Sequence, residues 1–133
     1  MAFKRVHPHE EMQRLVDLDY EQNMALLVCV PDGEGEAIVA MCRYDVDPAT
    51  RLADIAFVVR DEWQHRGVGT LLMHRMTEIA GSRGLAGFTA DVLPDNRAML
   101  GVFQHSGLQL KVENRAGVRH LQATFPPPAG RPD

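Results

Sequence analysis

The sequence predicts one α/β domain, built on a mixed, mainly antiparallel sheet that is flanked by helices. Three observations predict this fold class: short apolar runs bounded by turn residues, stretches with apolar residues at helical spacing, and a strand, glycine turn and helix in succession over residues 52–80. A chain of 133 residues fits one domain with a single core. The apolar fraction of 45% and the charged fraction of 24% are typical of a globular protein and not of a disordered one.

Six apolar runs bounded by turn residues are expected to be strands. They span residues 24–30, 37–44, 52–59, 88–92, 108–112 and 118–125. The first two are joined by Pro31-Asp32-Gly33-Glu34-Gly35, a link so short and so rich in turn formers that it predicts an antiparallel hairpin. We expect a polar loop over 45–50 and a closing hairpin around 113–117.

Three stretches carry apolar residues at helical spacing. The first, Glu10 to Tyr20, is compatible with a short amphipathic helix that precedes the strands. The second follows the glycine turn, and its apolar face is formed by Val68, Leu71, Leu72, Met76, Ile79 and Ala80. The third, Arg97 to His105, has an N-cap signal at Asn96 and is ended by Gly107. The proline-rich tail over 126–133 is expected to be extended and flexible, which leaves residues 1–125 for the domain.

Composition and spacing exclude several classes of protein. The net charge of −4 gives no basic field for nucleic acid or an anionic membrane, and no apolar run approaches the roughly 20 residues of a membrane span. The N-terminus lacks the apolar core of a secretory signal, and Cys29 and Cys42 lie in apolar runs as buried free thiols would. We therefore expect a cytoplasmic protein. Its six histidines are scattered without metal-ligand spacing, so no metal is expected.

The glycine turn, Gln64 to Thr70, is the stretch most suited to bind a ligand. Backbone N–H groups at the start of a helix lack internal partners and carry partial positive charge, and glycines let a phosphate approach them. The turn is not a Walker loop, because Gly69 is followed by Thr70 with no lysine. It is not a dinucleotide fingerprint either, because Leu72 stands where a small residue is required.

What remains is a Gln-x-x-Gly-x-Gly pattern, Gln64 to Gly69, that follows a strand and opens a helix. It resembles the acetyl-CoA pyrophosphate loop of the GNAT superfamily of N-acetyltransferases. Asn96 matches the asparagine that the family places before its next helix. Gly107 matches the glycine that ends this helix, with Leu108 where phenylalanine is usual. The likeness covers roughly residues 10 to 125 in element order.

Within the superfamily, residues 52–60 and 96–100 look most like the Pat-type bacterial protein lysine acetyltransferases, as does Asp19-Tyr20 shortly before Met24. The resemblance implies acetyl-CoA as co-substrate and a primary amine, such as a protein lysine, as acceptor. It implies that the strand ending in Val58-Val59 pairs with the pantetheine arm. The cofactor-binding residues that it implies are Phe57, Val58, Val59, Gln64, His65, Arg66, Gly67, Val68, Gly69, Thr70, Asn96, Met99 and Phe103.

Asp54 is the candidate general base. A free lysine-type amine has a pKa near 10.4, so a proton must be removed before the amine attacks the thioester. Asp54 lies four residues before Val58 and so shares its face of the strand. The Pat-type domains carry a glutamate there, and the shorter aspartate is expected to act through a water. Phe103 stands where many members have a tyrosine as general acid. The thiolate is a fair leaving group without one, because a thiol pKa is near 8.5.

Two further features bear on assembly and activity. The superfamily usually begins with a strand and a helix ahead of the stretch at Glu10, and this chain is expected to start after them. The sheet edge left uncovered would favour another covering element or a homodimer. A non-catalytic acyl-CoA sensor is the alternative to the enzyme, since Asp54 is shortened and Phe103 has no proton to give. An α+β domain with a purely structural glycine turn is a third interpretation.

Overall fold

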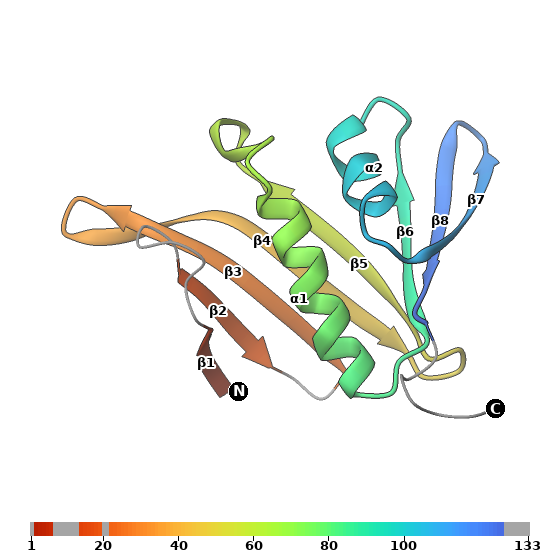
Figure 1. Ribbon diagram of the computed structural model, residues 1–133, viewed down its shortest axis with the longest axis horizontal. Helices are drawn as coiled ribbons and strands as arrows, with labels where there is room; N and C mark the ends of the chain where they lie inside the picture. The colour runs from red at the N-terminus through yellow and green to blue at the C-terminus, as the bar shows by residue number, and fades with distance from the viewer. Residues whose placement is uncertain (1, 7–13, 20–21, 127–133) are drawn as a thin grey trace.

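The computed structural model describes residues 2–6, 14–19 and 22–126, in which the strands form one continuous sheet (Figure 1). The elements are β1 (Ala2–Val6), β2 (Arg14–Asp19), β3 (Asn23–Asp32), β4 (Gly35–Asp47), β5 (Leu52–Val59), η1 (Asp61–Trp63), α1 (Val68–Ser82), β6 (Gly87–Val92), α2 (Arg97–Gln104), β7 (Gln109–Arg115) and β8 (Val118–Thr124). The strand order is β1-β2-β3-β4-β5-β6-β8-β7, and only the pair of β5 and β6 is parallel. The predicted fold class is thereby confirmed.

The helix predicted over residues 10–20 is wrong where the structure describes that stretch, because residues 14–19 form β2. Strand β2 pairs antiparallel with β3, from Arg14 opposite Cys29 to Asp19 opposite Met24. A short run with apolar residues at both spacings is decided by its neighbours, and β3 offers a row of unpaired backbone groups on that side. Strand β1 pairs in turn with β2, so the chain itself covers the edge of β3. The rest of the predicted helix lies outside the described residues.

Both hairpins are confirmed, with tighter turns than predicted. In the β3–β4 hairpin the turn is Gly33-Glu34, and Gly33 has a φ of +62°, as a glycine-first two-residue turn requires. In the β7–β8 hairpin the turn is Ala116-Gly117, where φ is positive at both residues. Strand β4 continues through Asp47, which shortens the loop predicted over 45–50, because Val46 pairs with Ala53 of β5.

Helices α1 and α2 both pack on one face of the sheet (Figure 1). The core between them and the strands includes the fully buried side chains of Tyr44, Phe88, Phe103, Leu26, Leu72, Met73 and Met76. Strand β5 shows the alternation that results: Ala53 and Ile55 are buried under the helices, and Asp54 is exposed on the opposite side. We call this opposite side of β4, β5, β6 and β8 the open face.

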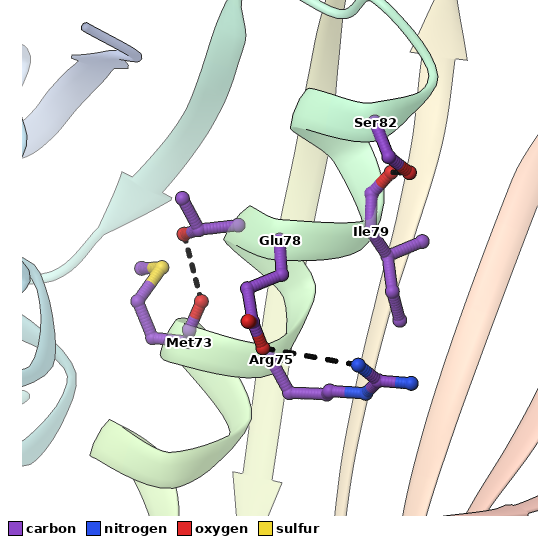
Figure 2. Close-up of polar contacts among 6 residues, drawn as sticks. Met73, Arg75, Glu78, Ile79 and Ser82 are labelled. Atoms are coloured by element: carbon purple, nitrogen blue, oxygen red, sulfur yellow. Dashed lines mark hydrogen bonds and ion pairs between the residues drawn. The ribbon is translucent and has the colours of Figure 1, made fainter. Parts of the chain in front are cut away.

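Two hydroxyl side chains of α1 donate to carbonyls of the same helix (Figure 2). Thr77 donates its hydroxyl to the carbonyl of Met73 at 2.8 Å, and Ser82 donates to the carbonyl of Ile79 at 2.7 Å. Arg75 and Glu78 are 3.8 Å apart, one turn from each other. These local contacts leave the apolar side of α1, from Val68 to Ala80, to pack on the sheet.

The cysteines are buried and not in disulfides, as predicted, and burial raises the pKa of the Cys42 thiol well above its ordinary value. Across the described part of the chain, neither helix has the length and apolar character to cross a membrane. The same part contains no group of three His, Cys, Asp or Glu side chains placed to hold a metal. Residues 127–133, most of the predicted tail, lie outside the described residues.

Candidate active site

Strands β5 and β6 pair over three positions only and then separate. Leu52, Ala53 and Asp54 lie opposite Gly87, Phe88 and Thr89. Beyond them β5 continues to Val59 beside β4, and β6 continues to Val92 beside β8 (Figure 1). After Asp54 and Thr89, therefore, no backbone hydrogen-bond ladder joins β5 to β6. A wedge-shaped gap opens there between the two strands.

A cavity of about 460 Å³ lies at the mouth of this wedge. It is walled by the end of β5, the glycine turn, the first turn of α1 and most of α2. Its lining residues include every predicted cofactor-binding residue except Arg66 and Phe103. Residues from 57 to 105 are thus brought together around one space. The lining residues that sequence reasoning did not single out are Trp63, Arg97, Ala98, Gly101, Val102 and His105.

The backbone of the glycine turn leads into α1 so that the helix begins at this cavity. Gly67 has a φ of +81° and its carbonyl accepts from the N–H of Leu71 at 2.9 Å, which starts the helix. Because the N-cap is a glycine, no side chain caps the first N–H groups of α1. Gln64 ties the turn to β5, since its Nε2 donates to the carbonyl of Val59 at 3.1 Å. Uncapped amides, a left-handed glycine and an adjoining cavity fit a diphosphate.

Gly69 is required for packing as well. A Cβ at this position would lie 2.8 Å from Cγ2 of Val102, which is closer than real Cβ contacts allow. The missing side chain therefore lets α2 approach the first turn of α1 and form the opposite wall of the cavity. Gly67 has no such neighbour within 4 Å, so its requirement is conformational.

Three predicted binding residues make contacts of their own. The Arg66 guanidinium lies 4.8 Å from the Trp63 ring centroid, which fixes its charge beside the turn but outside the cavity lining. Phe103 is buried and packs edge-on against Phe57 at 6.3 Å between ring centroids, so it supports the cavity from beneath. Asn96 lines the cavity and also caps α2, because its Oδ1 accepts from the N–H of Met99 at 3.2 Å.

Asp54 lies on the open face, at the point where β5 and β6 separate. It does not line the 460 Å³ cavity, although it shares its face of β5 with Val58, which does. Partial burial raises the pKa of the Asp54 carboxyl, and the neighbouring carboxylates of Asp91 and Asp45 raise it further, against a hydrogen bond from Thr89 and the charge of Arg43. A raised pKa makes this carboxylate a better proton acceptor near neutral pH.

A second, polar cavity of about 250 Å³ lies on the open face beyond Thr89. It is lined by Thr89, Asp91, Lys111, Glu113, Arg115, His120, Leu121 and Gln122. Sequence reasoning did not single out these residues. The available signal was the alternation of Thr89 and Asp91 with buried residues along β6, which marks a polar face on a central strand.

Comparison with known proteins identifies the family. Residues 1–108 match the family model described as acetyltransferase (GNAT) family. The chain belongs to this family. The chain is also 30% identical, over 118 residues, to acetyltransferase Pat of Mycolicibacterium smegmatis, a match that covers 87% of this chain and 34% of that protein. It thus spans about a third of the length of this curated relative.

Solved structures of acyltransferases share the fold. The GNAT domain of S. lividans PAT is 32% identical, with a TM-score of 0.67 over 81% of this chain and 64% of that one. A cAMP-binding acyltransferase from Mycobacterium smegmatis is 28% identical, with a TM-score of 0.66 over 82% of this chain and 33% of that one. A spermidine N-acetyltransferase from Vibrio cholerae, solved with CoA and spermine, has a TM-score of 0.61 at 13% identity over 78% of this chain and 66% of that one, which shows the fold alone.

Proposed function

We propose that this domain is an acetyl-CoA-dependent N-acetyltransferase that acetylates a primary amine by direct attack on the thioester. The observation that carries the proposal is the wedge between β5 and β6, which leads from the cavity at the glycine turn to the position of Asp54. Membership of the GNAT family supports the reaction class. The likeness to acetyltransferase Pat supports a protein lysine as the acceptor.

Different residues around the wedge would bind the cofactor, accept the proton and stabilise the transition state. The amides ahead of and within the first turn of α1 would hold the diphosphate, and the edge of β5 at Phe57 to Val59 that faces the wedge would pair with the pantetheine arm. Asp54 would accept the proton of the amine, through a water, from the open face. A backbone N–H near Val58 would stabilise the negative charge on the carbonyl oxygen during attack.

A non-catalytic acyl-CoA sensor is the second candidate. It is favoured by Phe103, which replaces a proton donor with a buried ring, and by the place of Asp54 outside the cavity lining. A sensor would bind acetyl-CoA through the same turn and release no thiol.

Calorimetry with acetyl-CoA, followed by a thiol-release assay over a panel of amines and lysine peptides, tests the proposal. Binding with amine-dependent thiol release is the expected result. Binding without release for every amine would identify the sensor. No binding at all would make the glycine turn purely structural and would overturn both.

A further inference from the structure

The open face carries a hydrogen-bonded imidazole–carboxylate pair that the proposed function does not use. His120 of β8 lies opposite Asp91 of β6 in the sheet register, and Nδ1 of the histidine lies 2.5 Å from Oδ1 of the aspartate. An imidazole that donates through Nδ1 carries its free lone pair on Nε2, where it can accept a proton. The His120 side chain is 34% exposed and lines the 250 Å³ cavity, so a ligand there can reach it.

The register places this pair beside Asp54. Asp54 lies opposite Thr89, and Asp91 follows two residues later on the same face of β6. Asp91 and His120 lie directly opposite each other, and Asp54 lies diagonally across from Asp91 on the same face, at the point where β5 and β6 separate. The effect of Asp91 on the titration of Asp54 supports their proximity.

Acetylation of an ammonium group requires two protons to leave the nitrogen. One leaves before attack, so that the lone pair can form the C–N bond. Another leaves once that bond has formed and the C–S bond breaks, which yields the amide. One of the two protons finally resides on the thiol and the other passes to solvent. A single carboxylate can hold only one of these protons at a time. A second acceptor beside it would shorten the path by which the other proton leaves the amine nitrogen.

We propose that the Asp91–His120 pair is this second proton acceptor, with Nε2 of His120 facing the acceptor amine and Asp91 positioning the ring. The inference rests on the proposed function and adds to it a site for the acceptor, the 250 Å³ cavity of the open face. Other charged groups that face the pair are Glu113, Lys111 and Arg115 from β7, Asp54 from β5, and Asp45 and Arg43 from β4. Glu113 and Arg115 are themselves paired at 3.1 Å.

The test compares His120→Gln with the wild-type domain in kcat/KM for a lysine peptide between pH 6 and pH 9.5. Loss of a positioned base should lower kcat/KM about tenfold at pH 7, and the deficit should shrink toward pH 9.5 as more of the amine is free. The acetyl-CoA affinity should stay within about twofold, because His120 lies outside the 460 Å³ cavity. His74→Gln, at an exposed position of α1, is the matched control and should leave both quantities unchanged.

Asp91→Asn should give a smaller loss, because asparagine keeps a hydrogen-bond acceptor for Nδ1–H but not the charge. Nitrogen NMR of the His120 ring adds a readout without turnover: the Nδ1–H form should dominate in the wild-type domain and decline in Asp91→Asn. A pH profile of His120→Gln that parallels that of an active wild type would overturn the inference, as would a dominant Nε2–H form. A wild type that binds acetyl-CoA but acetylates no amine would instead refute the proposed function, and this inference with it.

Discussion

The two faces of the sheet differ in what their side chains do, although β5 contributes to both. On the helix-covered face, Ala53 and Ile55 pack into an apolar core that fixes α1 and α2 and, through them, the glycine turn. On the open face, Asp54 lies diagonally across from the paired side chains of Asp91 and His120. One face thus builds the proposed cofactor site by packing, and the other carries the proposed proton acceptors as exposed side chains. Substitutions on each face should therefore damage different properties.

The largest effect is expected from the core. Phe88 is fully buried and contacts the rings of Tyr44 and Phe125. Phe88→Ala should lower the free energy of unfolding by about 3–5 kcal/mol, measured by urea denaturation, because it leaves a cavity in a packed core. Val112→Ala, at a half-exposed position of β7, is the control and should change it by less than about 0.5 kcal/mol. Equal losses from the two would contradict the assignment of Phe88 to the packed core.

On the open face, activity should change and cofactor affinity should not. Asp54→Ala should lower kcat/KM about 100-fold at pH 7, and by less at pH 9, because removal of a general base matters least when the amine is already free. Asp32→Ala, at the tip of the β3–β4 hairpin, is the control and should match the wild type. A pH–rate profile for Asp54→Ala identical to that of the wild type would remove Asp54 from the mechanism.

At the glycine turn, the affinity for acetyl-CoA is expected to change. Gly67→Val should weaken acetyl-CoA binding about tenfold in calorimetry, because a β-branched residue is strained at positive φ and would displace the amides of the turn. Gly67 is the better test position, since a side chain at Gly69 would also push α2 away. Gly81→Ala in α1 is the control, with space for its Cβ, and should preserve affinity. Unchanged affinity in Gly67→Val would argue against the turn as the binding site.

The smallest effect concerns the pH dependence of stability. The raised pKa of Asp54 means that the folded state binds its proton more tightly than the unfolded chain does. The residue therefore destabilises the fold increasingly as pH rises from the ordinary aspartate value through the raised one. Asp54→Asn should raise Tm by about 1–2 °C at pH 7, a small gain because the group is exposed, and should give no gain at pH 3. A lower Tm at pH 7 would show that the Thr89 hydrogen bond and Arg43 outweigh the burial.

The parts of the fold that depend on local chemistry could be predicted from the sequence. Strand β5 was predicted with its observed ends, because an apolar run is followed there by polar residues and a glycine turn. Most of the residues predicted to bind the cofactor line one cavity, and they were named because the turn, the end of β5 and Asn96 carry family motifs. Helix α1 was predicted from its apolar spacing, although the burial of Met73 was not.

The parts of the fold that depend on strand pairing could not be predicted from the sequence. Residues 14–19 became a strand because β3 offered an edge, which no local pattern encodes. The contact of Asp91 with His120 joins residues 29 positions apart, and it arises only from the register of β6 and β8. The position of Asp54 relative to the cavity likewise depends on where the β5–β6 ladder stops.

The early end of the β5–β6 ladder affects how the two parts of the sheet are joined. The β5–β6 ladder spans three positions, and just before it the N–H of Ala86 donates to the carbonyl of Arg51. The β1–β5 and β6–β8 parts of the sheet are therefore held together mainly by the helices and the shared core. An extended molecule bound in the wedge would form hydrogen bonds with the backbone edges of β5 and β6, as an additional strand would. Amide protons from Ile55 to Val59 should then exchange with solvent more slowly when such a molecule is bound than when the wedge is open.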